Sequence, residues 1–135
     1  MYRFEISLER ELTHQDFDLW LTRYKDAWEA RDPQAAVLLF TEDAHYYETP
    51  FSSPLSSRDE IYSYWSHMPR RQENLHFSYQ ILAVESDVGV ARWQTSFERL
   101  PTHKTVALDG ILQATFDDTG LCQIFEEWWH RLEGI

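Results

Sequence analysis

Glu127 is the residue whose surroundings most strongly suggest chemistry. It lies in a run over residues 121–131 that reads as a β-strand, and side chains alternate between the two faces of a strand. Phe125 and Trp129 therefore share its face. Burial among rings would raise the pKa of the carboxyl group and make it a general acid or base near neutral pH. The alternative is that Glu127 lies at an open rim, solvated or paired with Arg131.

Tyr24 is a second candidate, because it falls on the inner stripe of an amphipathic helix predicted from Thr13 to about Arg31. A phenol in a cavity could polarise a carbonyl oxygen of a bound molecule. An aromatic residue on such a stripe is, however, more often part of the core. Both interpretations stay open.

His45 shares strand parity with Tyr47 and Thr49 in a short predicted strand over residues 44–49. If this face points inward, His45 becomes an acid–base partner of Tyr24 or Glu127. A solvated or hydrogen-bonded histidine of no catalytic role is the alternative.

Metal and cofactor sites are not expected. The six histidines show no metal-ligand spacing, and the sequence contains neither a phosphate loop nor a dinucleotide fingerprint. Cys122 is the single cysteine, which excludes an intramolecular disulfide.

The elements that would position these residues divide the chain into a helical first half and a strand-rich second half. Helix-start signals occur at three places. They are Thr13 with Asp16, Asp32 with Pro33, and the run Ser57–Glu60, which is read as a second capping box. The predicted helices begin at Thr13, Asp32 and Ser57, and the predicted strands cover residues 44–49, 75–85, 90–100, 104–116 and 121–131. Short turns between the last four strands predict antiparallel hairpins.

Parity across these hairpins predicts one apolar, concave face. Glu127 is expected there opposite Gly110. The residues expected to line the cavity are Tyr47, Thr49, Trp93, Thr95, Phe97, Leu112, Phe125 and Trp129. Such walls favour a planar or hydrophobic ligand.

The opposite face of the last strand carries Cys122, Ile124 and Trp128, and is too apolar for a fully solvated surface. An exposed apolar stripe usually marks association, so Ile124 and Trp128 are predicted interface residues. A strand formed by residues 2–8 could cover this face instead.

The length, charge and composition of the chain exclude several classes of protein. The chain has 135 residues and a formal net charge of -11, which disfavours nucleic acids and anionic membranes as partners. Apolar residues make up 43% and aromatic residues 16%, enough for one packed core. With no apolar run of membrane-spanning length and no export signal, a soluble cytoplasmic protein is expected.

Several short motifs occur in a fixed order, and together they resemble the nuclear transport factor 2-like superfamily. They are Arg23-Tyr24-x-x-Ala27-x-x-Ala30-x-Asp32, Leu39-Phe40-x-x-Asp43-Ala44, Glu48-Thr49-Pro50, Asp59-x-Ile61 and Phe116-Asp117-x-x-Gly120. This superfamily includes SnoaL-type polyketide cyclases, ketosteroid isomerase and scytalone dehydratase. The resemblance implies an α+β cone in which three N-terminal helices pack on a strongly curved, mainly antiparallel sheet around a pocket. It also implies a homodimer through the convex face, and a single domain over residues 14–135 after an extension over residues 1–13.

The resemblance aligns Tyr24 with the oxyanion-hole tyrosine of ketosteroid isomerase. The positions of that enzyme's general-base aspartate and second oxyanion-hole acid fall on Thr49 and Leu112 here. Steroid isomerisation by the same mechanism is therefore not expected.

The function expected is binding of a small hydrophobic molecule by a SnoaL-like protein, without a cofactor. As an enzyme it would be of isomerase, cyclase, dehydratase or hydrolase type, with Glu127 as the acid–base group and Tyr24 polarising a substrate oxygen. The alternatives are a non-catalytic ligand-binding protein and a dimeric interaction protein whose own aromatic residues fill the cavity.

Overall fold

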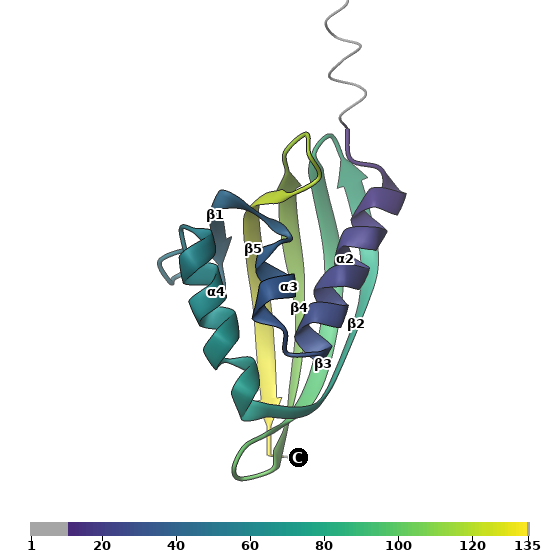
Figure 1. Ribbon diagram of the computed structural model, residues 1–135. Coiled ribbons are helices and arrows are strands. Elements are labelled where there is room, and N and C mark those ends of the chain that lie inside the picture. The colour runs from purple at the N-terminus through teal and green to yellow at the C-terminus, as the bar shows by residue number, and fades with distance from the viewer. Residues whose placement is uncertain (1–10, 135) are drawn as a thin grey trace, which may run out of the picture.

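The computed structural model describes residues 11–134, without the side chain of Pro69. Three helices lie on one side of a five-stranded sheet (Figure 1). The helices are α2 (His14–Glu29), α3 (Pro33–Val37) and α4 (Arg58–His67), followed by the 3-10 turn η1 (Pro69–Arg71). The strands are β1 (Phe40–Tyr47), β2 (Gln72–Glu85), β3 (Val88–Arg99), β4 (Lys104–Phe116) and β5 (Cys122–Glu133). The predicted segment over residues 2–8 lies outside the described residues.

The first two helices begin where the sequence predicts. The Thr13 hydroxyl accepts a hydrogen bond from the Asp16 backbone N–H at 3.0 Å, and the Asp16 carboxylate accepts one from the Thr13 N–H at 3.2 Å. This reciprocal pair is a capping box. Asp32 caps α3 through the Ala35 N–H at 3.1 Å, and Pro33 occupies the first helical position.

The cap of α4 differs from the prediction in one bond. The Ser57 hydroxyl accepts from the Glu60 N–H at 3.2 Å. The Glu60 carboxylate, however, accepts from the Ser56 N–H at 2.8 Å rather than from Ser57. The predicted capping box is therefore only half formed. None of the helices in the described part of the chain is long and apolar enough to cross a membrane.

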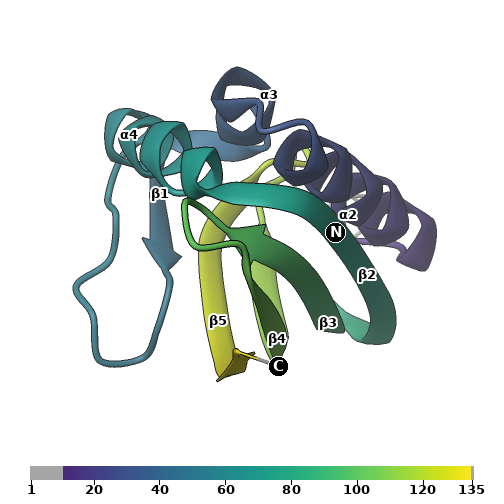
Figure 2. The same cartoon turned by 90° about the horizontal axis from the view of Figure 1, so that it is seen from below.

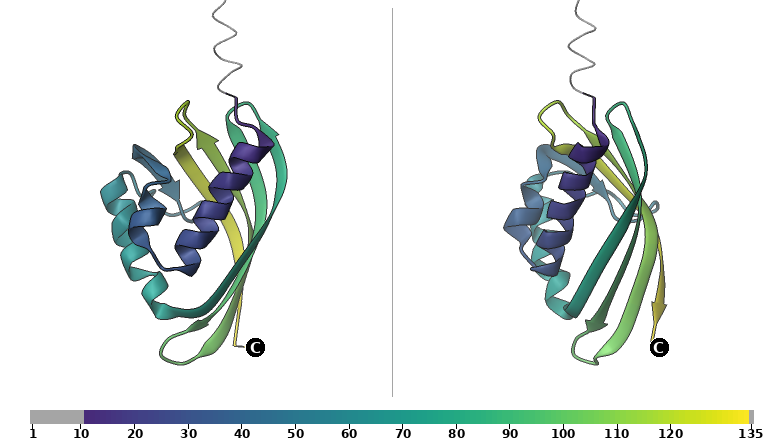
Figure 3. Two further views of the ribbon diagram at one scale, coloured as in Figure 1. Left: turned by 45° about the vertical axis from the view of Figure 1, so that its right-hand side comes forward. Right: turned by 90° about the vertical axis from the view of Figure 1, so that its right-hand side faces the viewer.

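The sheet has the strand order β1-β5-β4-β3-β2, and β1 alone pairs in parallel with its neighbour. The sheet curls around the helices without closing (Figure 2), and all three helices lie on its concave side (Figure 3). The predicted α+β cone with N-terminal helices on a curved, mainly antiparallel sheet is therefore confirmed.

Strand register confirms the inward face of the hairpins but corrects two positions. Trp93 of β3 pairs with Gly110 of β4, which pairs with Trp129 of β5. Glu127 pairs with Leu112, so the prediction that it lies opposite Gly110 was wrong.

The second correction concerns Cys122, which was expected on the outer face. A register shift lies between Thr115 and Phe116 of β4. It changes the side-chain parity, and Cys122 pairs with Phe116 and is fully buried. Burial raises the pKa of its thiol well above the usual range. Cys122 is thus part of the core.

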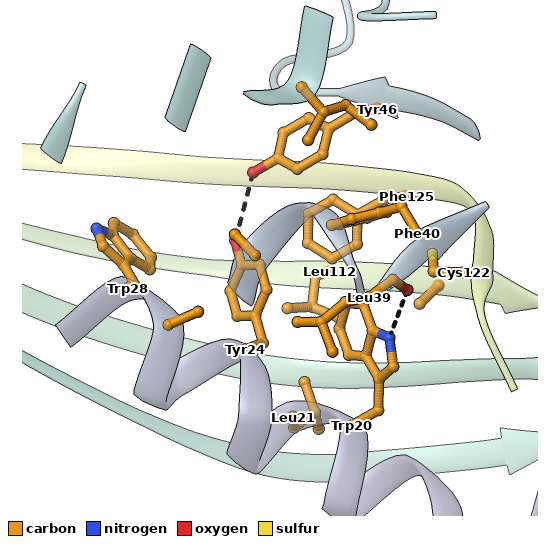
Figure 4. Packing of buried hydrophobic residues seen from close by; sticks show 14 of the residues in the cluster. Trp20, Leu21, Tyr24, Trp28, Leu39, Phe40, Tyr46, Leu112, Cys122 and Phe125 are labelled. Atoms are coloured by element: carbon orange, nitrogen blue, oxygen red, sulfur yellow. Dashed lines mark hydrogen bonds between the residues drawn. The ribbon is translucent and has the colours of Figure 1, made fainter. Parts of the chain in front are cut away.

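Aromatic residues of α2 join the helix to the concave face of the sheet. Trp20, Tyr24 and Trp28 recur every four residues, so they stand on one side of the helix. The Trp20 ring stacks on Tyr24 with centroids 5.4 Å apart, and its indole N–H donates to the Leu39 carbonyl at 3.0 Å (Figure 4). Phe125 packs against Tyr24 at 5.5 Å. This cluster fills one end of the cone.

Gly110 allows close approach of β5. A Cβ atom at this position would meet the Trp129 Cβ at 2.7 Å and its Cα at 2.9 Å. We expect Gly110→Ala to lower the free energy of unfolding by about 1–3 kcal/mol, because the strands must separate to accept the methyl group. Urea denaturation measures this change. Thr105→Ala, at an exposed position of the same strand, is the control and should change it by less than about 0.5 kcal/mol. Equal effects of the two substitutions would contradict the close approach.

Candidate functional site

A cavity of about 210 Å³ lies between the helices and the sheet, beyond the packed end of the cone. Its walls are largely aromatic and come from α2, α4, β3 and β5. Tyr24, Trp28, Trp65, Trp93, Phe97 and Trp129 are among the residues that line it. The aromatic residues thus surround an open space rather than filling it.

Glu127 contributes a carboxyl group to this cavity although the residue is only 5% exposed. Burial is the main cause that raises its pKa well above the ordinary value of 4.5, and the charge of Glu48 raises it further. A hydrogen bond from Tyr24 opposes the shift more weakly. Of the two sequence interpretations, the structure supports the buried one, and burial makes the Glu127 carboxyl keep its proton to a higher pH than an exposed glutamate does.

Glu48 is the second carboxyl group in the cavity, although alternation along the predicted strand over residues 44–49 places it on the face opposite Thr49, which was expected to line the cavity. It directly follows β1. The Tyr64 hydroxyl donates to the Glu48 Oε2 atom at 2.7 Å, and the Trp129 indole N–H donates to the Glu48 carbonyl at 2.9 Å. These two contacts hold both the side chain and the backbone of Glu48 in place. The motif Glu48-Thr49-Pro50 was the signal in the sequence, but it did not reveal which residue faces inward.

Tyr24 and Tyr46 bring their hydroxyl oxygens within 3.4 Å of each other (Figure 4). Tyr24 lines the cavity and is 1% exposed. Burial, followed by the charge of Glu127, raises the pKa of both phenols well above 10.0. Burial and the charge of Glu48 do the same for Tyr64. All three phenols therefore stay protonated and can donate hydrogen bonds.

The structure does not bring His45 into the cavity. Its side chain is exposed, so the predicted inward orientation was wrong. Tyr46 is buried instead, which shows that the inward residues of β1 are even-numbered at this end. Tyr47 and Thr49 are half-buried and lie outside the cavity lining, and the Thr49 hydroxyl is 2.7 Å from that of Ser52.

Apart from Cys122, parity was correct for the predicted inward residues of β3, β4 and β5, but not all of them reach the cavity. Trp93, Phe97 and Trp129 line it. The remaining three predicted residues are buried in other contacts. They are Leu112 and Phe125, which belong to the core cluster, and Thr95, whose hydroxyl donates to the His76 carbonyl at 2.7 Å.

A group of possible metal ligands lies elsewhere, on the rim of the sheet. Glu73, Glu98 and His103 bring one ligand atom each within 4.8 Å of one another. Hydrogen bonds to the Glu98 carboxylate lower its pKa. The larger effect comes from Asn74 and the smaller from His103. The trio is largely exposed and is accounted for by these surface hydrogen bonds, so it does not define a metal centre.

Comparisons with known proteins agree with this architecture. A family model described as a SnoaL-like domain matches residues 21–124. No curated protein sequence matches the chain significantly. One similar solved structure concerns the epoxide hydrolase/cyclase-like enzyme SalBIII in pyran ring formation in the polyether salinomycin. It is 14% identical with a TM-score of 0.76, over 86% of this chain and 92% of that chain.

Two further structures are similar at comparable levels. The protein RV0760c from Mycobacterium tuberculosis is 12% identical with a TM-score of 0.79, over 92% of this chain and 100% of that chain. A computationally designed 17-OHP binder is 12% identical with a TM-score of 0.75, over 86% of this chain and 96% of that chain. At these identities the likeness shows the fold alone.

The raised pKa of Glu127 makes a prediction for stability. In the unfolded chain the carboxyl loses its proton near pH 4.5, whereas in the folded protein it retains the proton to higher pH. The folded state then binds more protons, so this group's contribution to the free energy of unfolding falls as pH rises above 4.5. Glutamine does not titrate. We therefore expect Glu127→Gln to become progressively more stable than the natural protein above this pH, and the gain to level off above the folded-state pKa.

Urea denaturation between pH 4 and pH 9 measures this difference. Glu126→Gln is the matched control, because Glu126 is the preceding residue and its side chain faces away from the cavity, where Gln113 donates to it at 3.3 Å. A stability difference for Glu127→Gln that does not change with pH would contradict the shifted pKa.

Proposed function

Since the chain belongs to the SnoaL-like domain family, we propose that it is a cofactor-independent enzyme that moves protons on a small, largely apolar ring compound, with Glu127 as the acid. The observation that carries this proposal is a carboxyl group of raised pKa that lines an aromatic cavity beside protonated phenols. Titratable groups perturbed in this way, within a cavity, are typical of catalytic sites.

The two carboxyl groups support a division of roles. Glu127, protonated, would donate its proton to an oxygen atom of the bound compound, such as a carbonyl or an epoxide oxygen. Glu48, held by Tyr64, would accept a proton from a carbon or hydroxyl group of the same compound. The compound gains one proton and loses one, so an isomerisation or ring closure balances without a co-reactant. Pairs of acids in unequal environments commonly divide acid and base roles in this way.

Tyr24 and Tyr46 would assist at the oxygen atom that develops negative charge. Their hydroxyls form a pair 3.4 Å apart, and Tyr24 also contacts the cavity. A buried, preorganised donor stabilises developing charge more strongly than water does, and loss of one such donor typically costs 10²–10³ in rate.

The volume of the cavity limits the compound to about one ring. A cavity of about 210 Å³ is smaller than the roughly 300–1,000 Å³ of typical ligand pockets. An apolar cavity of about 150 Å³ accepts benzene. We therefore expect a monocyclic compound with small substituents.

Catalysis can be tested by following proton exchange and ring opening by NMR with two monocyclic probes, acetophenone in D₂O and styrene oxide. We expect the natural protein to accelerate at least one reaction. Glu127→Gln should lower that rate by about 10²–10⁴, as for loss of a general acid or base, and Glu126→Gln should leave it unchanged. Tyr24→Phe should lower the rate by a smaller factor.

Two outcomes would overturn the proposal. If Glu127→Gln is as active as the natural protein, Glu127 is not the acid. If the natural protein binds the probes, detected through fluorescence of the cavity tryptophans, but accelerates neither reaction, the non-catalytic ligand-binding alternative is favoured.

The convex face of β5 supports association into a homodimer. Ile124, Trp128 and Leu132 are 39%, 42% and 57% exposed on this face. Large exposed apolar side chains in one row are typical of interfaces. A second copy of the chain would cover them.

We expect the double substitution Ile124→Lys/Trp128→Lys to convert a dimer to a monomer in native mass spectrometry, because the charges would oppose burial of the face. Leu38→Lys, at a residue of similar exposure on the other side of the molecule, should leave the dimer intact. A natural protein that is monomeric at micromolar concentration would contradict the predicted dimer.

A further inference from the structure

Three arginine residues line the end of the cavity that is farthest from the packed core. They are Arg71 of η1, Arg99 of β3 and Arg131 of β5. The backbone holds two of the elements together, since the Leu100 N–H donates to the Arg71 carbonyl at 2.9 Å. In Figure 1 this is the end of the sheet where β5 finishes and the loop between β3 and β4 lies.

This gathering of positive charge is unexpected in so acidic a chain. The protein has 12 Lys and Arg residues against 23 Asp and Glu, yet three of the 12 line a single small cavity. Arg99 is paired with Glu133 at 2.9 Å. Within residues 11–134, no hydrogen bond or ion pair engages the guanidinium groups of Arg71 and Arg131. Two guanidinium groups are therefore available to a ligand.

The spacing between Arg131 and Glu127 limits the size of a ligand that could contact both residues. Both residues have the parity of the inward face of β5, with Trp129 between them, and all three line the cavity. Arg131 lies four positions after Glu127 along β5, so the Cα atoms of the two residues are about 13 Å apart at the usual rise per residue. One substituted six-membered ring fits between side chains at this spacing, against the wall that Trp129 provides.

We infer that the natural ligand of the cavity is a monocyclic carboxylic acid, whose carboxylate is bound by Arg71 and Arg131 at the mouth while its ring extends toward Glu127. Guanidinium groups suit carboxylates because they offer parallel N–H donors to both oxygen atoms. The inference rests on the proposed function in that it names the substrate class of the same site. It does not depend on Glu127 transferring a proton.

The inference can be tested by comparing 4-hydroxybenzoate with its neutral isostere 4-hydroxybenzamide by isothermal titration calorimetry. We expect the carboxylate to bind about tenfold or more tightly than the amide to the natural protein at low salt, and the preference to shrink at high salt. The double substitution Arg71→Gln/Arg131→Gln should abolish the preference. Arg92→Gln is the control, because Arg92 pairs with Asp109 on the outer face and should leave the preference unchanged.

Equal or weaker binding of the carboxylate would overturn the inference, as would binding of neither compound at millimolar concentration or a preference that survives the double substitution. Glu127→Gln separates this result from the proposed function. It should retain the preference for the carboxylate, so that failure of the catalytic proposal would leave this preference intact. Conversely, if the natural protein shows no preference for the carboxylate, the catalytic proposal still stands. It is tested separately by the effect of Glu127→Gln on the reaction rate.

Discussion

The packing of α2 across the concave face of the sheet is the contact on which the rest of the structure depends. Tyr24 and Trp28 meet Phe125 and Trp93 of the sheet with ring centroids 5.5 and 5.9 Å apart. This layer of rings excludes water from the interior of the cone. Without it, Glu127 would be hydrated and its carboxyl would behave as an ordinary surface acid. The same contact therefore builds the core, forms a wall of the cavity and raises the pKa of Glu127.

Several polar groups lie inside this apolar interior, and contacts with neighbouring groups position some of them. Tyr64 holds Glu48, Trp129 holds the backbone of Glu48, and Tyr46 lies beside Tyr24. Burial of polar groups costs free energy unless they are hydrogen-bonded, so such clusters persist where they serve a function. The cavity therefore carries the carboxyl groups of Glu48 and Glu127 toward its interior and the guanidinium groups of Arg71, Arg99 and Arg131 at its mouth. A ligand with a polar group at each end would match both.

The sequence predicts the parts of this arrangement that depend on neighbouring residues, and it misses the parts that depend on pairing between distant strands. Helix starts at Thr13 and Asp32 depend on neighbouring residues, and hairpins carry strand parity from one strand to the next, so the inward faces of β3, β4 and most of β5 could be predicted. Parity failed in β1, which has no hairpin partner. It pairs in parallel with β5, and its register shifts between Phe40 and His45. Phe40, Ala44 and Tyr46 are all buried, so these even-numbered residues of β1 face inward and His45 faces outward. Only the three-dimensional pairing shows that Glu48 enters the cavity.

The central claim is that the Glu127 carboxyl is a desolvated acid, and titration of that group by ¹³C NMR tests it most directly. In protein labelled at the glutamate side-chain carboxyl, the signal absent from the Glu127→Gln spectrum identifies the residue. We expect a titration midpoint well above the ordinary value of 4.5. A midpoint at or below that value would mean that Glu127 is hydrated or ion-paired in solution, and would contradict its burial as a desolvated acid.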